Sequence, residues 1–164
     1  MRVAVLSKGT VDSVAKAARV IHSAANQLEE VRADARPDAS IDSAYLDETV
    51  GMVSGAKVLE ALALELVLKA RLLRAGIRPP KWHSHSDLFA LLPATEQQDA
   101  ERIYQTGRQP AMRATLAEVL DISAKTFERW RYHQEQPAEA SIGEMQHAFN
   151  ALIAPLGLTP LAAG

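Results

Sequence analysis

The segment between Asp42 and Gly76 constrains the fold of this chain more than any other part of the sequence. It holds no proline, Asp42 or Ser43 can cap its start, and Gly76 provides a stop. Its apolar residues would cover nearly the whole circumference of a helix, and they include Val58, Leu59, Leu62, Leu64, Leu66, Val67, Leu68, Leu72 and Leu73. Only surrounding helices can bury so many faces. The sequence therefore predicts an all-α, multi-helix up-and-down bundle around a long central apolar helix.

Weaker helical patterns flank this segment on both sides. Apolar residues at steps of three and four predict a first helix that starts near Val11 and ends before Pro37. Prolines and glycines separate the helices that follow. The first of these helices is expected after a cap at Ser86 or Asp87, and the second over Ala94 to Gln105 with Thr95 as its cap. The third is expected over Met112 to Gln134 with a break near Asp121 to Ser123, and the last over Glu139 to Leu156.

The first residues, MRVAVLSKG, alternate like a short strand. A strand, loop and helix in this order can bind phosphate, but no second strand follows, and one strand cannot form a sheet. We therefore interpret residues 1–10 as an arm. The prediction is one helical domain over residues 11–158 and a tail over 159–164, as suits a chain of 164 residues.

The chain contains no cysteine. This excludes disulfides, thiolate catalysis and cysteine-based zinc sites, and nothing links the chain to an oxidising compartment. No stretch approaches the roughly 18 consecutive apolar residues of a membrane span. We therefore expect a cytoplasmic protein with no membrane partner.

The net charge of −2 argues against strong general attraction to nucleic acid, but the charges are unevenly distributed. Residues 66–133 hold 11 Lys/Arg against 7 Asp/Glu, or +4, and the rest holds 7 against 13, or −6. Two interpretations fit this pattern. The cations could form a basic face or phosphate site, or they could lie on a solvated helix end, where they interact favourably with the C-terminal end of the helix dipole. The densest group of cations is Lys69, Arg71, Arg74, Arg78 and Lys81.

The loop HSHSD places His83, His85 and Asp87 at alternate positions, as some zinc sites do. Such sites usually draw further ligands from distant loops. The other histidines all fall on predicted helices, and they are His22, His133 and His147. We therefore expect no metal here, and interpret the loop as a capping segment.

The stretch TLAEVLDISAKTFERW has the spacing of a helix-turn-helix. Asp121 and Ile122 would form its turn and Ser123 would cap a recognition helix. A DNA-binding regulator is thus one alternative function, although Asp121 stands where glycine is common.

Three pieces of sequence, in order between Tyr45 and Glu135, resemble the HEPN superfamily of helical bundle proteins. The long helix carries an ExxxK pair, a histidine before an Asp-Leu step opens the next helix, and a late helix carries WRY. The residues at these positions are Glu65 and Lys69, then His85, Asp87 and Leu88, then Trp130, Arg131 and Tyr132.

This resemblance implies a homodimer that binds RNA or a nucleotide-like ligand, often as a ribonuclease of a toxin or phage-defence system with a cognate antitoxin or operon partner. The family's ribonuclease motif is Arg, four to six residues, then His, and it acts without a metal or cofactor. The late helix departs from this motif, because three residues separate Arg129 from His133 and only one residue separates Arg131 from His133. Arg78 has the family's spacing to both His83 and His85, but it lies in the proline loop. Ligand-binding candidates are Glu65, Lys69, Arg78, His85, Asp87 and Tyr132.

The nine residues FERWRYHQE, 127–135, hold the catalytic candidates Arg129, Arg131 and His133. Arg129 and His133 would share one helix face, where histidine can move a proton and arginine can stabilise phosphate charge. A structural interpretation also fits, with Phe127 and Trp130 in the core. The hypothesis is a HEPN-like RNA-binding module whose late helices face each other in a dimer; the alternatives are the DNA-binding regulator and an antitoxin-like interaction module without catalysis.

Overall fold

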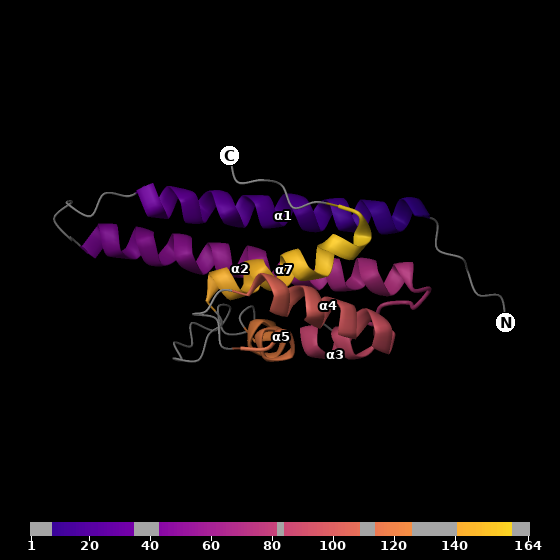
Figure 1. Cartoon of the computed structure of the whole chain (residues 1–164). Coiled ribbons are helices and arrows are strands. Elements are labelled where there is room, and N and C mark those ends of the chain that lie inside the picture. The colour runs from indigo at the N-terminus through magenta and orange to yellow at the C-terminus, as the bar shows by residue number, and fades with distance from the viewer. Residues whose placement is uncertain (1–7, 35–42, 82–83, 109–113, 126–140, 159–164) are drawn as a thin grey trace.

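The computed structural model describes residues 8–34, 43–81, 84–108, 114–125 and 141–158 (Figure 1). Within these ranges all regular structure is helical and no strand occurs, so the predicted all-α class is confirmed for them. The elements are α1 (Lys8–Asp34), α2 (Ser43–Arg74), α3 (His85–Ala90), α4 (Ala94–Gly107), α5 (Leu116–Ala124), α7 (Ile142–Ile153) and the 3-10 helix η1 (Ala154–Leu156).

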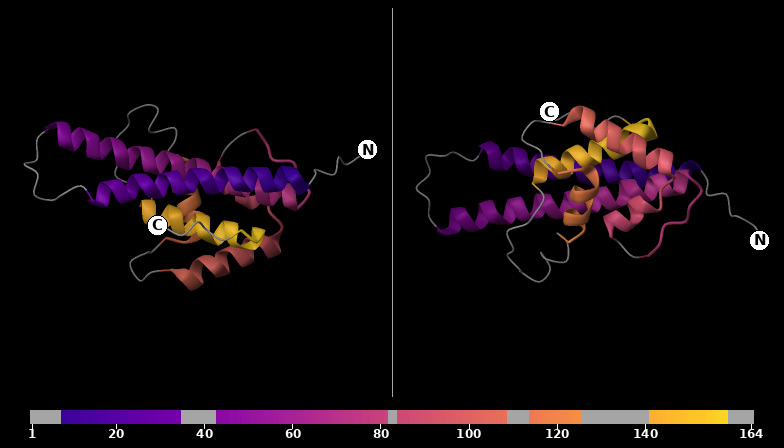
Figure 2. Two further views of the ribbon diagram at one scale, coloured as in Figure 1. Left: turned by 90° about the horizontal axis from the view of Figure 1, so that it is seen from above. Right: turned by 60° about the horizontal axis from the view of Figure 1, so that its bottom comes forward.

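The two longest helices, α1 and α2, lie side by side along the molecule (Figures 1 and 2). They are antiparallel, since His22 meets Glu60 while Leu28, further along α1, lies near Gly55, further back along α2. Their facing sides are rich in small residues, which allow close approach of the two backbones. The buried alanines of this pair include Ala15, Ala18 and Ala25 of α1 and Ala56 and Ala61 of α2.

The shorter helices gather beside the C-terminal half of α2, where α3 and α7 pack directly on it (Figure 2). There α7 lies against both α2 and α4, and α3 and α5 lie against each other. The apolar residues of these helices form one core with α2, because each helix buries one face against its neighbours. Its fully buried members include Leu64, Leu68, Leu72, Leu88, Leu116, Leu120, Met145, Phe149 and Leu152.

Neighbouring helices leave some apolar side chains of α2 exposed to solvent in the described part of this helix. Leu62 is 38% exposed, and Val58 and Leu59 are half-buried, so neighbouring helices do not enclose every apolar face. The sequence pattern alone led us to expect fuller enclosure.

Capping residues explain where the helices begin and end. Gly76 adopts φ 74° two residues after Arg74, the last residue of α2, which confirms the predicted stop. The first helix begins at Lys8, ahead of the predicted start. The third begins after Ser84, whose side chain accepts from the backbone N–H of Asp87, rather than after Ser86 or Asp87.

Two capping boxes start the last helices. The side chain of Thr115 accepts from the backbone of Glu118, whose carboxylate accepts in return from Thr115, and Ser141 and Glu144 repeat this arrangement at α7. These starts lie four and three residues later than the sequence pattern suggested.

Candidate functional site

Cations gather at the C-terminal end of α2 and in the loop that follows it. Arg71 is only 1% exposed, the side chain of Arg74 is 36% exposed, and Arg78 and Lys81 are exposed. Arg71 and Arg74 lie in the last turn of α2, where positive charge interacts favourably with the helix dipole.

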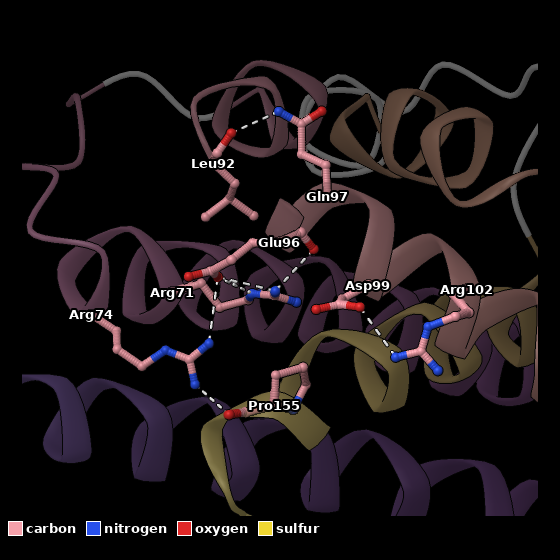
Figure 3. A network of polar contacts seen from close by, with 8 residues as sticks. All are labelled: Arg71, Arg74, Leu92, Glu96, Gln97, Asp99, Arg102 and Pro155. Atoms are coloured by element: carbon pink, nitrogen blue, oxygen red, sulfur yellow. Dashed lines mark hydrogen bonds and ion pairs between the residues drawn. The ribbon is translucent and has the colours of Figure 1, made fainter. Parts of the chain in front are cut away.

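Glu96, in the first turn of α4, lies between the two arginines of α2 (Figure 3). Its Oε2 accepts from Arg71 Nε at 3.1 Å and lies 3.0 Å from Arg71 Nη2. The same oxygen lies 3.4 Å from Arg74 Nη2, while Arg74 Nη1 donates to the carbonyl of Pro155. These contacts bind the end of α2 to α4 and η1.

Arg71 has a structural environment rather than that of a ligand-binding group. Burial lowers the pKa of Arg71, and the hydrogen bond and charge of Glu96 oppose this effect. Its Nη1 atom is buried without a hydrogen-bond partner. Glu96 thus occupies Arg71 and Arg74, whereas Arg78 and Lys81 have no carboxylate partner in the described part of the chain.

The predicted ExxxK pair of α2 forms an ion pair. Lys69 Nζ lies 2.6 Å from Glu65 Oε1, and the two side chains are 20% and 17% exposed. At positions i and i+4 of one helix, this contact is expected from the helical repeat alone.

Two ligand candidates of the HSHSD loop, His85 and Asp87, lie in different environments. His85 is 3% exposed, and its Nδ1 lies 2.8 Å from the hydroxyl oxygen of Ser123, which itself donates to the carbonyl of Leu120. Asp87 is exposed to solvent. His85 therefore joins α3 to α5 and does not share a site with Asp87.

The remaining predicted site residues lie outside the described ranges. These residues are His83, Arg129, Arg131, Tyr132 and His133.

The helix-turn-helix interpretation needed a turn at Asp121 and Ile122. Instead, α5 continues through both residues and ends at Ala124, and Ser123 is fully buried beside His85. The predicted turn and the predicted cap at Ser123 are wrong, because packing against α3 holds this segment helical, and the helix ends one residue beyond the predicted break.

A buried polar pair that sequence reasoning missed joins α1 to α2. His22 Nδ1 lies 2.9 Å from both carboxylate oxygens of Glu60, and the two residues are 2% and 0% exposed. The imidazole stacks on Phe149 of α7, with ring centroids 4.1 Å apart and an interplanar angle of 13°. Burial raises the pKa of Glu60, and the hydrogen bond and charge of His22 only partly oppose this.

Further polar contacts extend from this pair to α7. Asn26 Nδ2 lies 3.3 Å from His22 Nε2, and Gln146 Nε2 donates to Asn26 Oδ1 at 2.7 Å. The signal for His22 was present in the sequence, since it falls between Ala18 and Ala25 on the apolar face of the first helix. The network connects three helices through groups that are expensive to bury unpaired.

Among the residues whose placement is described, no three His, Asp or Glu side chains come together as metal ligands. Over the same residues, no helix combines the length and the apolar character that crossing a membrane requires.

Comparison with known proteins found no matching family model, no matching curated protein and no matching solved structure. The resemblance to the HEPN superfamily therefore depends on the sequence pieces alone, and function has to be argued from the residues of this chain.

Proposed function

We propose that this chain is a HEPN-like helical module that binds RNA or a nucleotide-like ligand as a cytoplasmic homodimer. One observation supports the choice of surface. Arg78 and Lys81 are exposed after α2, and no described carboxylate neutralises them. Exposed cations of this kind contact phosphate oxygens without reading sequence.

The neighbouring arginines strengthen the argument for this location. Glu96 holds Arg71 and Arg74 in place in the last turn of α2, which leads into the loop that carries Arg78 and Lys81. One carboxylate between two guanidinium groups leaves an excess of positive charge at this end of α2. In a chain of net charge −2, such a local excess is what phosphate binding requires.

Catalysis is a separate part of the proposal. If the protein is a metal-independent endoribonuclease, its catalytic candidates are Arg129, Arg131 and His133. His133→Ala would then abolish cleavage while leaving RNA affinity within about twofold, since the loop cations supply the binding.

The test of the binding surface compares two charge-matched double variants in RNA titrations at several salt concentrations. Arg78→Ala/Lys81→Ala should lower the salt slope of log K by about 1.4, since each phosphate contact to single strands contributes about 0.7. Arg102→Ala/Lys125→Ala removes the same charge from exposed side chains on α4 and after α5, and should leave the slope unchanged. Equal effects of the two variants would contradict the proposed surface.

A further inference from the structure

The first helix is attached to the rest of the fold by small apolar side chains. Its buried apolar residues are Ala15, Ala18 and Ala25, and none of the largest fully buried side chains among the described residues comes from α1. The shorter α7 contributes four of these large side chains, which are Met145, Phe149, Leu152 and Ile153. Because stabilisation by packing follows the apolar area that is buried, α1 gains less from packing than its length alone would suggest.

The larger apolar residues of α1 do not close this difference. Val14, Ile21 and Leu28 are half-buried, and Val20 and Val31 are exposed. In Figures 1 and 2, α1 lies along one edge of the fold, where it packs on α2 and meets α7. It can therefore separate from these two helices without parting the other helices from one another.

The interface of α1 with α2 covers a carboxyl group that has a single hydrogen-bond donor. His22 Nδ1 lies 2.9 Å from both oxygens of Glu60, and it is the one donor that reaches them from the described residues. An ionised carboxylate can accept about four hydrogen bonds, and Glu60 is fully buried, so water does not supply the others. The ionised form of Glu60 is therefore poorly satisfied while α1 covers it.

No second charge compensates Glu60 within the described part of the chain. His22 alone acts on the carboxylate there, and Arg19, one turn earlier on α1, does not. On the side of α7 the pair meets the ring of Phe149, which does not titrate, and the polar contacts of α7 reach His22 only through amide side chains. His22 and Glu60 therefore set the proton balance of this interface.

Deprotonation of Glu60 should loosen the interface. Burial raises the pKa of Glu60, so the closed arrangement keeps its proton at pH values where an exposed carboxyl group would lose it. The stabilisation is thus fully present below the unfolded pKa of roughly 4.3 and is lost as pH rises through the folded pKa. Once α1 moves away, water solvates the carboxylate and the cost of burying it disappears.

We propose that α1 is a pH-controlled displaceable helix, which separates from α2 and α7 as a unit when Glu60 loses its proton. The helices α2, α3, α4, α5 and α7 keep their packing in the open form, because the large apolar side chains of the core come from them. Opening thus differs from a general loss of stability, since it uncovers the α1-facing side of α2 and leaves the core formed. The device goes beyond the proposed RNA binding and does not depend on it.

Hydrogen exchange measured by mass spectrometry tests the opening on the unmodified chain. From pH about 5 to about 8, after correction for the intrinsic exchange rate, the most protected amides of α1 should be less protected than those of α7. Relative to Glu60→Gln, the opening of α1 in the wild type should increase by about tenfold for each unit by which burial raises the folded pKa. Equal protection of the two helices, or the same pH trend in Glu60→Gln, would overturn the proposal.

Thiol labelling tests the opening by a second route, because the chain has no cysteine of its own. Ala25→Cys lies on the buried face of α1, and Ala100→Cys lies on the buried face of α4. At pH about 8 a maleimide should label Ala25→Cys at least about tenfold faster than Ala100→Cys, and adding Glu60→Gln should slow the first reaction only.

A matched control keeps the charge change on α1 but moves it to the surface. Glu30→Gln removes an exposed carboxyl group from α1 and should leave both labelling rates unchanged. Equal labelling at the two cysteine positions, or a Glu30→Gln effect as large as that of Glu60→Gln, would contradict the displaceable helix.

Discussion

His22 Nδ1 lies 2.9 Å from both carboxylate oxygens of Glu60, and water reaches almost no part of either residue. The two residues are 38 positions apart in the sequence and come from the two longest helices. Because Phe149 stacks on the imidazole, the pair also fixes the position of α7.

The stability of the protein should depend on pH through Glu60. Its folded pKa is raised by burial, so its contribution is fully present below the unfolded pKa of roughly 4.3 and is lost as pH rises through the folded pKa. Glu60→Gln keeps a hydrogen-bonding group but has no carboxyl group to titrate. The wild type should therefore lose stability relative to Glu60→Gln as pH rises from 4 to 8, as measured by urea unfolding.

Glu118→Gln provides a control of opposite sign. The backbone and side-chain hydrogen bonds of Thr115 lower the pKa of Glu118, so its contribution is present above the unfolded pKa and is lost as pH falls through the folded value. If both variants changed with pH in the same direction, the account of Glu60 would be wrong.

Replacing both members of the buried pair should cost less than removing one. His22→Leu leaves the Glu60 carboxylate buried without its partner, and should lower the free energy of unfolding by about 3 to 5 kcal/mol. The double variant His22→Leu/Glu60→Leu has no uncompensated charge, so its cost should be smaller or absent. A double-mutant cycle by thermal unfolding measures this, and additive losses would contradict it.

Gly107 should not tolerate alanine. A Cβ atom there would lie 2.7 Å from Cε1 of His147, and that ring is held by a 2.7 Å contact between its Nε2 and the carbonyl of Tyr104. Gly107→Ala should therefore destabilise the fold by about 1 to 3 kcal/mol. Gly143→Ala is the matched control, because no atom lies within 4 Å of its added Cβ, and it should be neutral or stabilising by up to about 1 kcal/mol.

Ser123→Ala should weaken the junction of α3 and α5. It removes the 2.8 Å hydrogen bond between Ser123 and the buried His85, and a cost of about 1 to 3 kcal/mol is expected for such a loss. Ser13→Ala removes a serine hydrogen bond from an exposed helix surface and should change stability by less than about 0.5 kcal/mol. Equal melting temperatures for the two variants would show that the Ser123 contact contributes little.

Helical spacing predicted the class of the fold and most of its elements, because the 3.6-residue repeat is a local property. The stop at Gly76 was predicted for the same reason, since φ 74° suits a residue without a Cβ. The turn expected at Asp121 and Ile122 was wrong, since the helix continues through both residues to Ala124. Asp121 is a poor helix former, but tertiary packing of Ser123 against His85 decides the conformation there.

The polar contacts between helices were beyond what the sequence could predict. No acidic residue lies between Lys69 and Lys81 in the sequence, yet Glu96 reaches Arg71 from 25 residues further along the chain. In the same way, the sequence offers His22 several acidic residues on the next helix, and only the packing register selects Glu60. Pairing across helices depends on this register, which residue spacing within one helix does not determine.

Equilibrium binding of the wild-type protein to single-stranded RNA and to duplex DNA, over a series of salt concentrations, tests the central claim most directly. The account predicts tighter binding to the RNA, with an affinity that falls steadily as salt rises because phosphate contacts release counterions. Tighter, sequence-selective binding to duplex DNA, or no binding to either nucleic acid at low salt, would contradict it.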